Sequence, residues 1–308
     1  MISVIAGGVG AARYLKALLE VVPDDQITAI VNTGDDTVFH GLHISPDIDT
    51  VVYTTSGAID VERGWGLSGE SWTAMESLAR YAPYGAPDWF NLGDRDLATH
   101  LWRTGQLRNG RSLTQITADL ALAWGLGIKV LPMTNDPVAT FVQTTEHGEL
   151  AFQEYFVKHR HGVAVSSVRF AGIESCIPGP EVLSTIASAT RIVIAPSNPI
   201  VSIGPVLDVP GVRDALIARR ADVVAISPII AGAALKGPAD RLLTELGHQS
   251  SALGIARLYA PFAGTLVIDT LDAELAPAIE ALGLRCIVTD TIMSQPGVSA
   301  SLAATTLA

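Results

Sequence analysis

The sequence predicts a Rossmann-like α/β fold, a mostly parallel sheet with helices on both faces. Three observations support this class. The chain opens with a buried strand, a glycine turn and a helix, and after residue 179 short apolar runs alternate regularly with helical segments. Hydrophobic residues make up 48% of the 308 residues and charged residues 17%, which is ample for a large buried core. We expect one α/β domain with an insert.

The first element is the apolar run Ile2–Ala6, which is followed by Gly7-Gly8-Val9-Gly10 and a helix from Ala11. A glycine turn at a helix N-terminus favours phosphate, because free N–H groups and the helix dipole attract negative charge. The candidates are Gly7, Gly8, Gly10 and Ala11. The turn is not a dinucleotide fingerprint, since Arg13 occupies the third glycine position, and it lacks the end of a Walker loop. A tight turn without a ligand is the alternative.

Acidic residues follow the second predicted strand, Ile27–Val31, which we expect to be parallel to the first. Its carboxyl end carries Asp35 and Asp36, and the segment 46–50 adds Asp47 and Asp49. Four carboxylates beside a phosphate turn suggest a divalent cation shared with phosphate oxygens. Capping and loop roles are the alternative, with Asp49 capping the turn at 51–55. The residues alone leave both interpretations open.

The composition changes between about residues 59 and 124, which we expect to form a mainly helical insert in a core made of residues 1–58 and 125–308. Four of the five tryptophans lie between Trp65 and Trp102. Such an insert could offer a stacking pocket for a planar ligand, although core packing is the expected fate of Trp72, Trp102 and Trp124. His100 is expected to be solvated or capped and not to be catalytic. The helices are expected at Ser71–Tyr81, Asp94–Thr104 and Ser112–Trp124.

The remaining chain returns to the α/β pattern after a predicted strand at Ile128–Leu131 and a β-hairpin at 138–145 and 150–157. Two polar, proline-containing loops, 196–199 and 227–230, follow predicted strands and could contact the edge of a base. Expected strands are 191–195, 222–227, 266–269 and 286–289. Expected helices are 181–188, 212–220, 239–246, 252–259 and 273–282.

Charge and composition exclude several classes of partner. The net charge of −11 makes nucleic acid and anionic membranes poor partners. Two cysteines, Cys176 and Cys286, provide neither a disulfide framework nor a metal cluster, and we expect buried thiols. The chain shows no signal peptide and no apolar run of membrane-spanning length, so a cytoplasmic location is expected.

Together these segments resemble the 2-phospho-L-lactate transferase (CofD-like) family of deazaflavin coenzyme biosynthesis, and they keep the family's order along nearly the whole chain. The Gly-Val-Gly-Ala-Ala-Arg opening is similar to the actinobacterial branch, with Ala11 replacing a usual glycine. The matching segments are 7–10, 32–36, 46–50, 63–66, 92–100, 152–155, 195–199, 202–205, 227–230 and 236–238.

The resemblance implies a Mg²⁺-dependent transferase. A guanosine-diphosphate-linked donor would give its phospholactyl or phosphoenolpyruvyl group to the ribityl hydroxyl of the deazaflavin Fo, and GMP would leave. The actinobacterial branch is associated with the enolpyruvyl donor, but the sequence does not choose between the two. A homodimer is implied as well.

The resemblance also assigns roles to the candidates. The glycine turn would hold the donor diphosphate, and Asp49, with Asp36 or Asp35, would hold Mg²⁺. Asp49 would also contact the acceptor hydroxyl, either as its base or only as a metal ligand. Asn91 and Asp94 would line the deazaflavin site. Asn198, Ser202 and Lys236 would contact the donor nucleotide.

Two other functions compete with this one. Proteins of related fold bind nucleotide sugars and regulate metabolism without established catalysis, and they share the glycine-rich opening. An NAD-dependent oxidoreductase is disfavoured by Arg13 and by the surplus of carboxylates.

Overall fold

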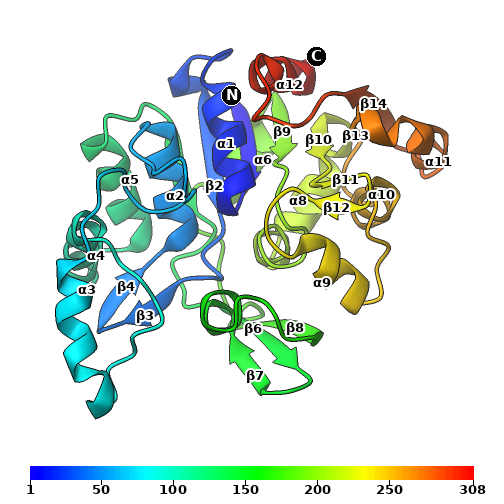
Figure 1. Cartoon of the computed structure of the whole chain (residues 1–308). Coiled ribbons are helices and arrows are strands. Elements are labelled where there is room, and N and C mark those ends of the chain that lie inside the picture. The colour runs from blue at the N-terminus through cyan, green and yellow to red at the C-terminus, as the bar shows by residue number, and fades with distance from the viewer.

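A computed structural model describes all residues, 1–308, and its centre is a seven-stranded parallel sheet (Figure 1). The strand order is β14-β13-β10-β9-β1-β2-β5. The strands span β1 Ile2–Ala6, β2 Ile27–Val31, β5 Lys129–Pro132, β9 Arg191–Ile194, β10 Val223–Ile226, β13 Thr265–Asp269 and β14 Arg285–Thr289. The predicted fold class is therefore confirmed.

The strand order reverses beside β1. From β1 the chain moves outward to β2 and β5, and it then returns to build β9, β10, β13 and β14 on the other side of β1. The loops that leave β1 and β9 therefore diverge at their carboxyl ends, which is where open α/β sheets bind ligands. These loops are the glycine turn at 7–10 and the segment 195–203.

Helices cover both faces of the sheet because alternate strand residues point to opposite sides. In β1, Val4 belongs to the buried cluster that includes residues of the helices α1, α2, α5 and α12, whereas Ile5 belongs to the cluster that includes residues of α6, α8, α10 and α11. The first group spans α1 Gly8–Leu18, α2 Pro46–Thr55, α5 Leu113–Ala123 and α12 Val298–Leu307. The second group spans α6 Val182–Ser188, α8 Val212–Ala218, α10 Ala252–Tyr259 and α11 Ala276–Glu280.

The other elements surround the carboxyl edge of the sheet (Figure 1). The residues of the expected insert carry α3 Thr73–Leu78, η2 Ala79–Tyr84 and α4 Asp94–Arg108, as well as α5. A hairpin of β3 Thr37–Phe39 and β4 Leu42–Ile44 lies next to α4. A second sheet has the order β7-β6-β8. The remaining elements are α7 Gly204–Asp208, the strand pair of β11 Ile229–Ile230 and β12 Ala233–Ala234, and α9 Ala239–Glu245. The division into core and insert stays a prediction.

The predicted hairpin at 138–157 differs from the structure in its second arm. β6 Ala139–Thr144 pairs with the shorter β7 Gly148–Ala151, and the chain then turns into a short π-helical segment, η3 Glu154–Lys158. The third strand, β8 Val165–Ala171, pairs with β6 and was not predicted. The reason is burial, since Tyr155 is fully buried and anchors η3 against the core.

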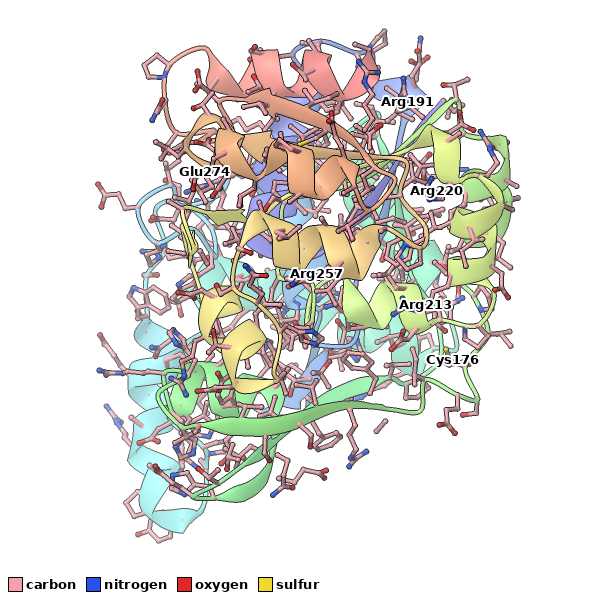
Figure 2. The ribbon with its side chains drawn as sticks, turned by 90° about the vertical axis from the view of Figure 1, so that its right-hand side faces the viewer. Cys176, Arg191, Arg213, Arg220, Arg257 and Glu274 are labelled. Carbon is pink, nitrogen blue, oxygen red and sulfur yellow. The ribbon has the colours of Figure 1, made fainter.

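The two thiols are free. Cys176 is buried, as expected, while Cys286 on β14 is partly exposed. Figure 2 shows Cys176 on the side of the molecule that also carries Arg213 and Arg220. Burial raises the pKa of the Cys286 thiol to about 11, and burial also raises that of Cys176. Neither thiol is activated as a nucleophile.

Candidate active site

One cavity of about 650 Å³ lies at the point where the strand order reverses. The glycine turn and the loop after β9 form its centre, and α2 and the predicted insert form one side. The η3 segment and the residues leading into α9 form the other side. The residues that sequence analysis selected from distant segments therefore share one cavity, with the exceptions described below.

The glycine turn is closely packed against the protein's own loops. Gly8 has a φ of +71°, in the left-handed region that favours glycine. A Cβ on Gly10 would lie 2.0 Å from the carbonyl oxygen of Pro196, and one on Gly7 would lie 2.6 Å from that of Ser202. Gly7 and Gly10 are therefore required because the loop after β9 approaches them closely, and Gly8 is required because of its backbone conformation.

The backbone amides at the start of α1 are of two kinds: some donate hydrogen bonds within the protein, and the others are available to a ligand in the cavity. Ala11 N–H donates to Ser197 Oγ over 3.1 Å, and Gly8 N–H donates to the carboxylate of Asp47. The amides of Val9 and Gly10 have no partner within the protein. These two N–H groups, at the positive end of the helix dipole, are placed to bind an anion.

Two buried carboxylates, those of Asp35 and Asp47, line the cavity together with this turn, and neither forms an ion pair with a basic side chain. Asn32 Nδ2 donates to Asp47 Oδ2 over 2.9 Å, and Asp35 Oδ1 is buried with no hydrogen-bond partner. Burial raises the pKa of Asp47 to about 6. Burial and the neighbouring charge of Asp47 raise the pKa of Asp35 well above its usual range. Two neighbouring buried carboxylates are unfavourable when both are ionised, and a bound cation would stabilise their ionised forms.

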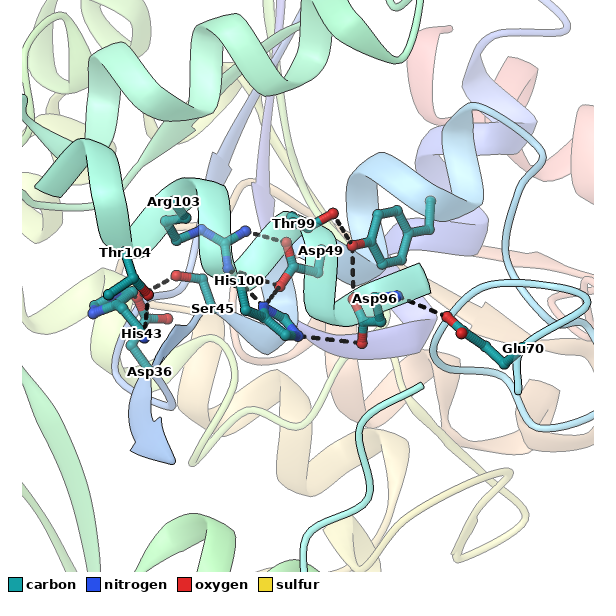
Figure 3. Close-up of polar contacts among 11 residues, drawn as sticks. Asp36, His43, Ser45, Asp49, Glu70, Asp96, Thr99, His100, Arg103 and Thr104 are labelled. Carbon is teal, nitrogen blue, oxygen red and sulfur yellow. Dashed lines mark hydrogen bonds and ion pairs between the residues drawn. The ribbon is translucent and has the colours of Figure 1, made fainter. Parts of the chain in front are cut away.

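Asp49 lies two residues further along the first turn of α2 and is engaged differently (Figure 3). Arg103 Nη1 donates to Asp49 Oδ2 over 3.0 Å, and Arg103 Nη2 donates to Asp49 Oδ1. The side chain of Arg103 is 1% exposed and that of Asp49 is 7% exposed. Asp49 thus belongs to a buried, bidentate ion pair that joins α2 to α4.

The same network continues along α4 (Figure 3). His100 Nε2 lies 3.3 Å from Asp96 Oδ2, and Tyr53 donates its hydroxyl proton to Asp96 Oδ1 over 2.7 Å. Oxygen or nitrogen atoms of Asp49, Asp96 and His100 lie within 4.8 Å of one another, a spacing compatible with a divalent metal ion. Arg103 already compensates the charge of Asp49 in this cluster.

The other predicted residues are distributed around this centre. Gly7, Gly8, Gly10, Asn91, Asn198, Ser202 and Lys236 line the cavity, whereas Ala11, Asp36 and Asp94 do not. Asp36 accepts hydrogen bonds from His43 and Ser45 and lines a separate cavity. Asp94 accepts hydrogen bonds from the amides of Thr73 and Ala74 at the start of α3. Asn198 Oδ1 accepts the amide of Ile200 and shapes its own loop.

Sequence reasoning missed several residues of the network. His100 was expected to be solvated or capped, but its side chain is 1% exposed and faces Asp96. Arg103 was not singled out at all. The spacing of residues 96, 100 and 103 places them on one face of a helix, and this pattern was the available signal. Trp102, expected in a core, is instead 36% exposed.

An open parallel sheet with free helix amides and buried carboxylates in one cavity is the arrangement of a Rossmann-like phosphate-binding protein. The comparison with family models specifies this class further. The model of the family "2-phospho-L-lactate transferase CofD" matches residues 2–302, and the chain therefore belongs to this family and is a transferase.

The relatives agree with this assignment. The chain is 43% identical to a phosphoenolpyruvate transferase from Nocardia farcinica, over 94% of this chain and 90% of the relative. It is also 43% identical to a phosphoenolpyruvate transferase from Kitasatospora aureofaciens, over 99% of this chain and 96% of the relative. The structure of protein BH3568 from Bacillus halodurans is similar with a TM-score of 0.64 at 18% identity, covering 100% of this chain and 99% of that one, and it supports the fold alone. No helix of the chain is both long and apolar enough to cross a membrane.

Proposed function

We propose that the protein transfers a phospholactyl or phosphoenolpyruvyl group from a guanosine-diphosphate-linked donor to the ribityl hydroxyl of the deazaflavin Fo. In this reaction the hydroxyl oxygen forms a bond to the phosphorus of the transferred group. The bond from that phosphorus to the oxygen of the GMP phosphate breaks, GMP leaves, and the hydroxyl proton passes to a base or to water. The names of the actinobacterial relatives favour the enolpyruvyl donor.

The observation that carries this proposal is the sharing of one cavity by three kinds of group. Unpartnered amides of Val9 and Gly10 suit a phosphate, and the carboxylates of Asp35 and Asp47 lie beside them. Trp65 and Phe90, from the predicted insert, line the same cavity. A transferase that joins a diphosphate to a flat acceptor needs these groups within reach of each other.

The residues fit the Mg²⁺ that the family implies. Mg²⁺ prefers hard oxygen ligands and is usually held by one or two carboxylates together with substrate phosphates. The buried, unpartnered Asp35 Oδ1 and the neighbouring Asp47 provide such a set beside the glycine turn. We propose these two as the metal ligands, because Asp49 is already neutralised by Arg103. A bound Mg²⁺ would neutralise charge on the phosphate oxygens.

The remaining residues of the site bind and orient the substrates. The amides of Val9 and Gly10 would hold a diphosphate oxygen, and Ser202, beside Gly8, would fix the loop after β9. Asp49 would accept a hydrogen bond from the acceptor hydroxyl while Arg103 holds its carboxylate in place. Asn91, which is exposed at the cavity, would bind a polar edge of the deazaflavin.

The test is the mass of the product formed from Fo, Mg²⁺ and each donor in turn. We expect a product that contains one phospholactyl or phosphoenolpyruvyl group, with release of GMP and loss of activity in EDTA that Mg²⁺ restores. The faster donor decides between the two groups. Binding of UDP-sugars without turnover of Fo would contradict the proposal and favour a regulatory protein. Light scattering tests the homodimer that the family resemblance implies.

A further inference from the structure

Two large aromatic side chains leave part of their surface exposed at the cavity. Trp65 is 41% exposed and Phe156 is 37% exposed, and both line the cavity. Apolar surface of this size in a cavity is a common platform for a planar ligand. The two residues come from segments about ninety positions apart in the chain.

Phe156 belongs to η3, which forms one side of the cavity together with the residues leading into α9. Its ring stacks on that of Phe152, with centroids 5.5 Å apart and an interplanar angle of 26°. Phe152 packs in one buried cluster with Val201 and with Leu242 of α9. Because Val201 precedes Ser202, which lies beside Gly8, the Phe152–Phe156 pair is fixed to the loop that meets the glycine turn.

The π-helical segment η3 places the side chains of Phe156 and its neighbour Tyr155 in different environments. Tyr155 is fully buried, whereas Phe156, whose ring also lies 5.4 Å from that of His161, is partly exposed and lines the cavity. Gln153 Nε2 donates to the backbone oxygen of Asp35 over 3.2 Å, which fixes the start of the segment. At its end, Arg241 of α9 donates to the backbone oxygens of His161 and Val163. The platform is thus held at both ends.

Trp65 comes from the predicted insert. It lies in the segment that follows α2, and its indole lies edge-on to Trp72, with ring centroids 6.0 Å apart. The guanidinium of Arg63 lies 5.6 Å from the ring of Trp65 and 5.3 Å from that of Trp72. Arg63 and Trp65 line the same cavity as Asp49 and as Asp96 of α4.

In phosphoryl transfer the attacking and leaving oxygens lie roughly in line, on opposite sides of the phosphorus. An acceptor beside Asp49 therefore requires the leaving nucleotide to extend toward the loop after β9 and η3. We infer that Phe156 is the stacking platform for the purine of the donor, and that Trp65 serves the flat acceptor instead. This inference rests on the proposed function.

The test compares Phe156→Ala, Phe156→Leu and Phe156→Tyr in the full chain, with GDP, ADP and Fo as ligands in calorimetry. Loss of a base–aromatic stack is expected to weaken GDP binding by about 5- to 150-fold in Phe156→Ala. Phe156→Leu keeps apolar bulk but no π-face and is expected to lose affinity too, whereas Phe156→Tyr retains it. The ratio of GDP to ADP affinity stays constant, because every base has a π-face.

Trp65→Ala is the matched control, with the opposite pattern expected: weaker Fo binding and unchanged GDP binding. Circular dichroism checks the fold of each variant. Unchanged GDP affinity in Phe156→Ala, or equal losses for GDP and Fo, overturns the inference. If the wild-type protein bound GDP but formed no product from Fo, the proposed function would be overturned, whereas the inference that Phe156 stacks on the purine would be unaffected. Normal turnover in the wild type with normal GDP affinity in Phe156→Ala overturns the platform alone.

Discussion

Arg103 binds both carboxylate oxygens of Asp49, and this ion pair links α4 to α2 in a buried position beside the cavity. The aspartate raises the pKa of the guanidinium although burial acts to lower it, so the arginine stays charged. The pair has two consequences. It fixes the orientation of Asp49. It also makes the contact between α2 and α4 depend on two buried charges, because removing either one leaves the other uncompensated.

Arg103→Gln is expected to destabilise the protein by about 3–5 kcal/mol, because it leaves the Asp49 carboxylate buried without its cation. Urea unfolding measures the change. The double variant Asp49→Asn/Arg103→Gln is the control, since it removes both charges, and we expect it to be less destabilised than the sum of the single variants by about 1–3 kcal/mol. Additive single effects would contradict a direct interaction between these residues.

Asp35→Asn is expected to stabilise the apoprotein at pH 8 and to remove the stabilisation by Mg²⁺. Because burial raises the native-state pKa of Asp35, the native state binds more protons than the unfolded state, and stability is lost as the pH rises through that pKa. Below the usual carboxyl range both states are protonated, so the gain from the substitution should vanish there. Thermal unfolding from pH 3 to 8, with and without Mg²⁺, measures both effects. Equal Mg²⁺ stabilisation in the variant would remove Asp35 from the metal site.

Asp94 provides a contrast of opposite sign. Hydrogen bonds from Ser71 and from the amides of Ala74 and Thr73 lower the pKa of Asp94, so its contribution to stability is present above the usual carboxyl range and lost as the pH falls through the lowered native pKa. Asp94→Ala is expected to speed hydrogen exchange in α3 selectively, since it removes the helix cap. If the residue acts only as a cap, the KM for Fo stays near the wild-type value. A large rise in this KM with a stable α3 would instead place Asp94 at the acceptor, as the family resemblance implies.

The sheet was predictable because its strands, apart from the edge strand β14, are buried on both faces, and because all of them appear as short apolar runs between helices. Every strand of the central sheet falls on such a run, from Ile2–Ala6 to Arg285–Thr289. Segments fixed by tertiary contacts were not predictable. The strand β8 carries exposed and half-buried residues without clean alternation, and η3 is held by the burial of Tyr155.

The candidate site was predictable as a set of segments but not as a set of contacts. Sequence alone placed the acids of residues 35–49 near the glycine turn, because they follow neighbouring parallel strands. It could not tell which carboxylate meets Gly8, because Asp47 and Asp49 differ only by their positions on the first turn of α2. That choice depends on Arg103, a partner 54 residues away from Asp49 in the chain.

Substitutions of Gly8 and Gly10 in the glycine turn are expected to destabilise the protein for different reasons. Gly8→Ala adds a Cβ that has room, 3.6 Å from Ser202 Oγ, but keeps a φ of +71°, so we expect a cost of about 1–2 kcal/mol and a properly folded protein. Gly10→Ala would place its Cβ 2.0 Å from the backbone oxygen of Pro196, which forces α1 and the loop after β9 apart. We therefore expect Gly10→Ala to lower GDP affinity and the unfolding midpoint more than Gly8→Ala does. Gly57→Ala, at another positive φ with no atom within 4 Å of the added Cβ, is the control for backbone strain away from the cavity. If Gly10→Ala bound GDP as well as Gly57→Ala, the close approach of α1 to the β9 loop would not be what shapes the phosphate site.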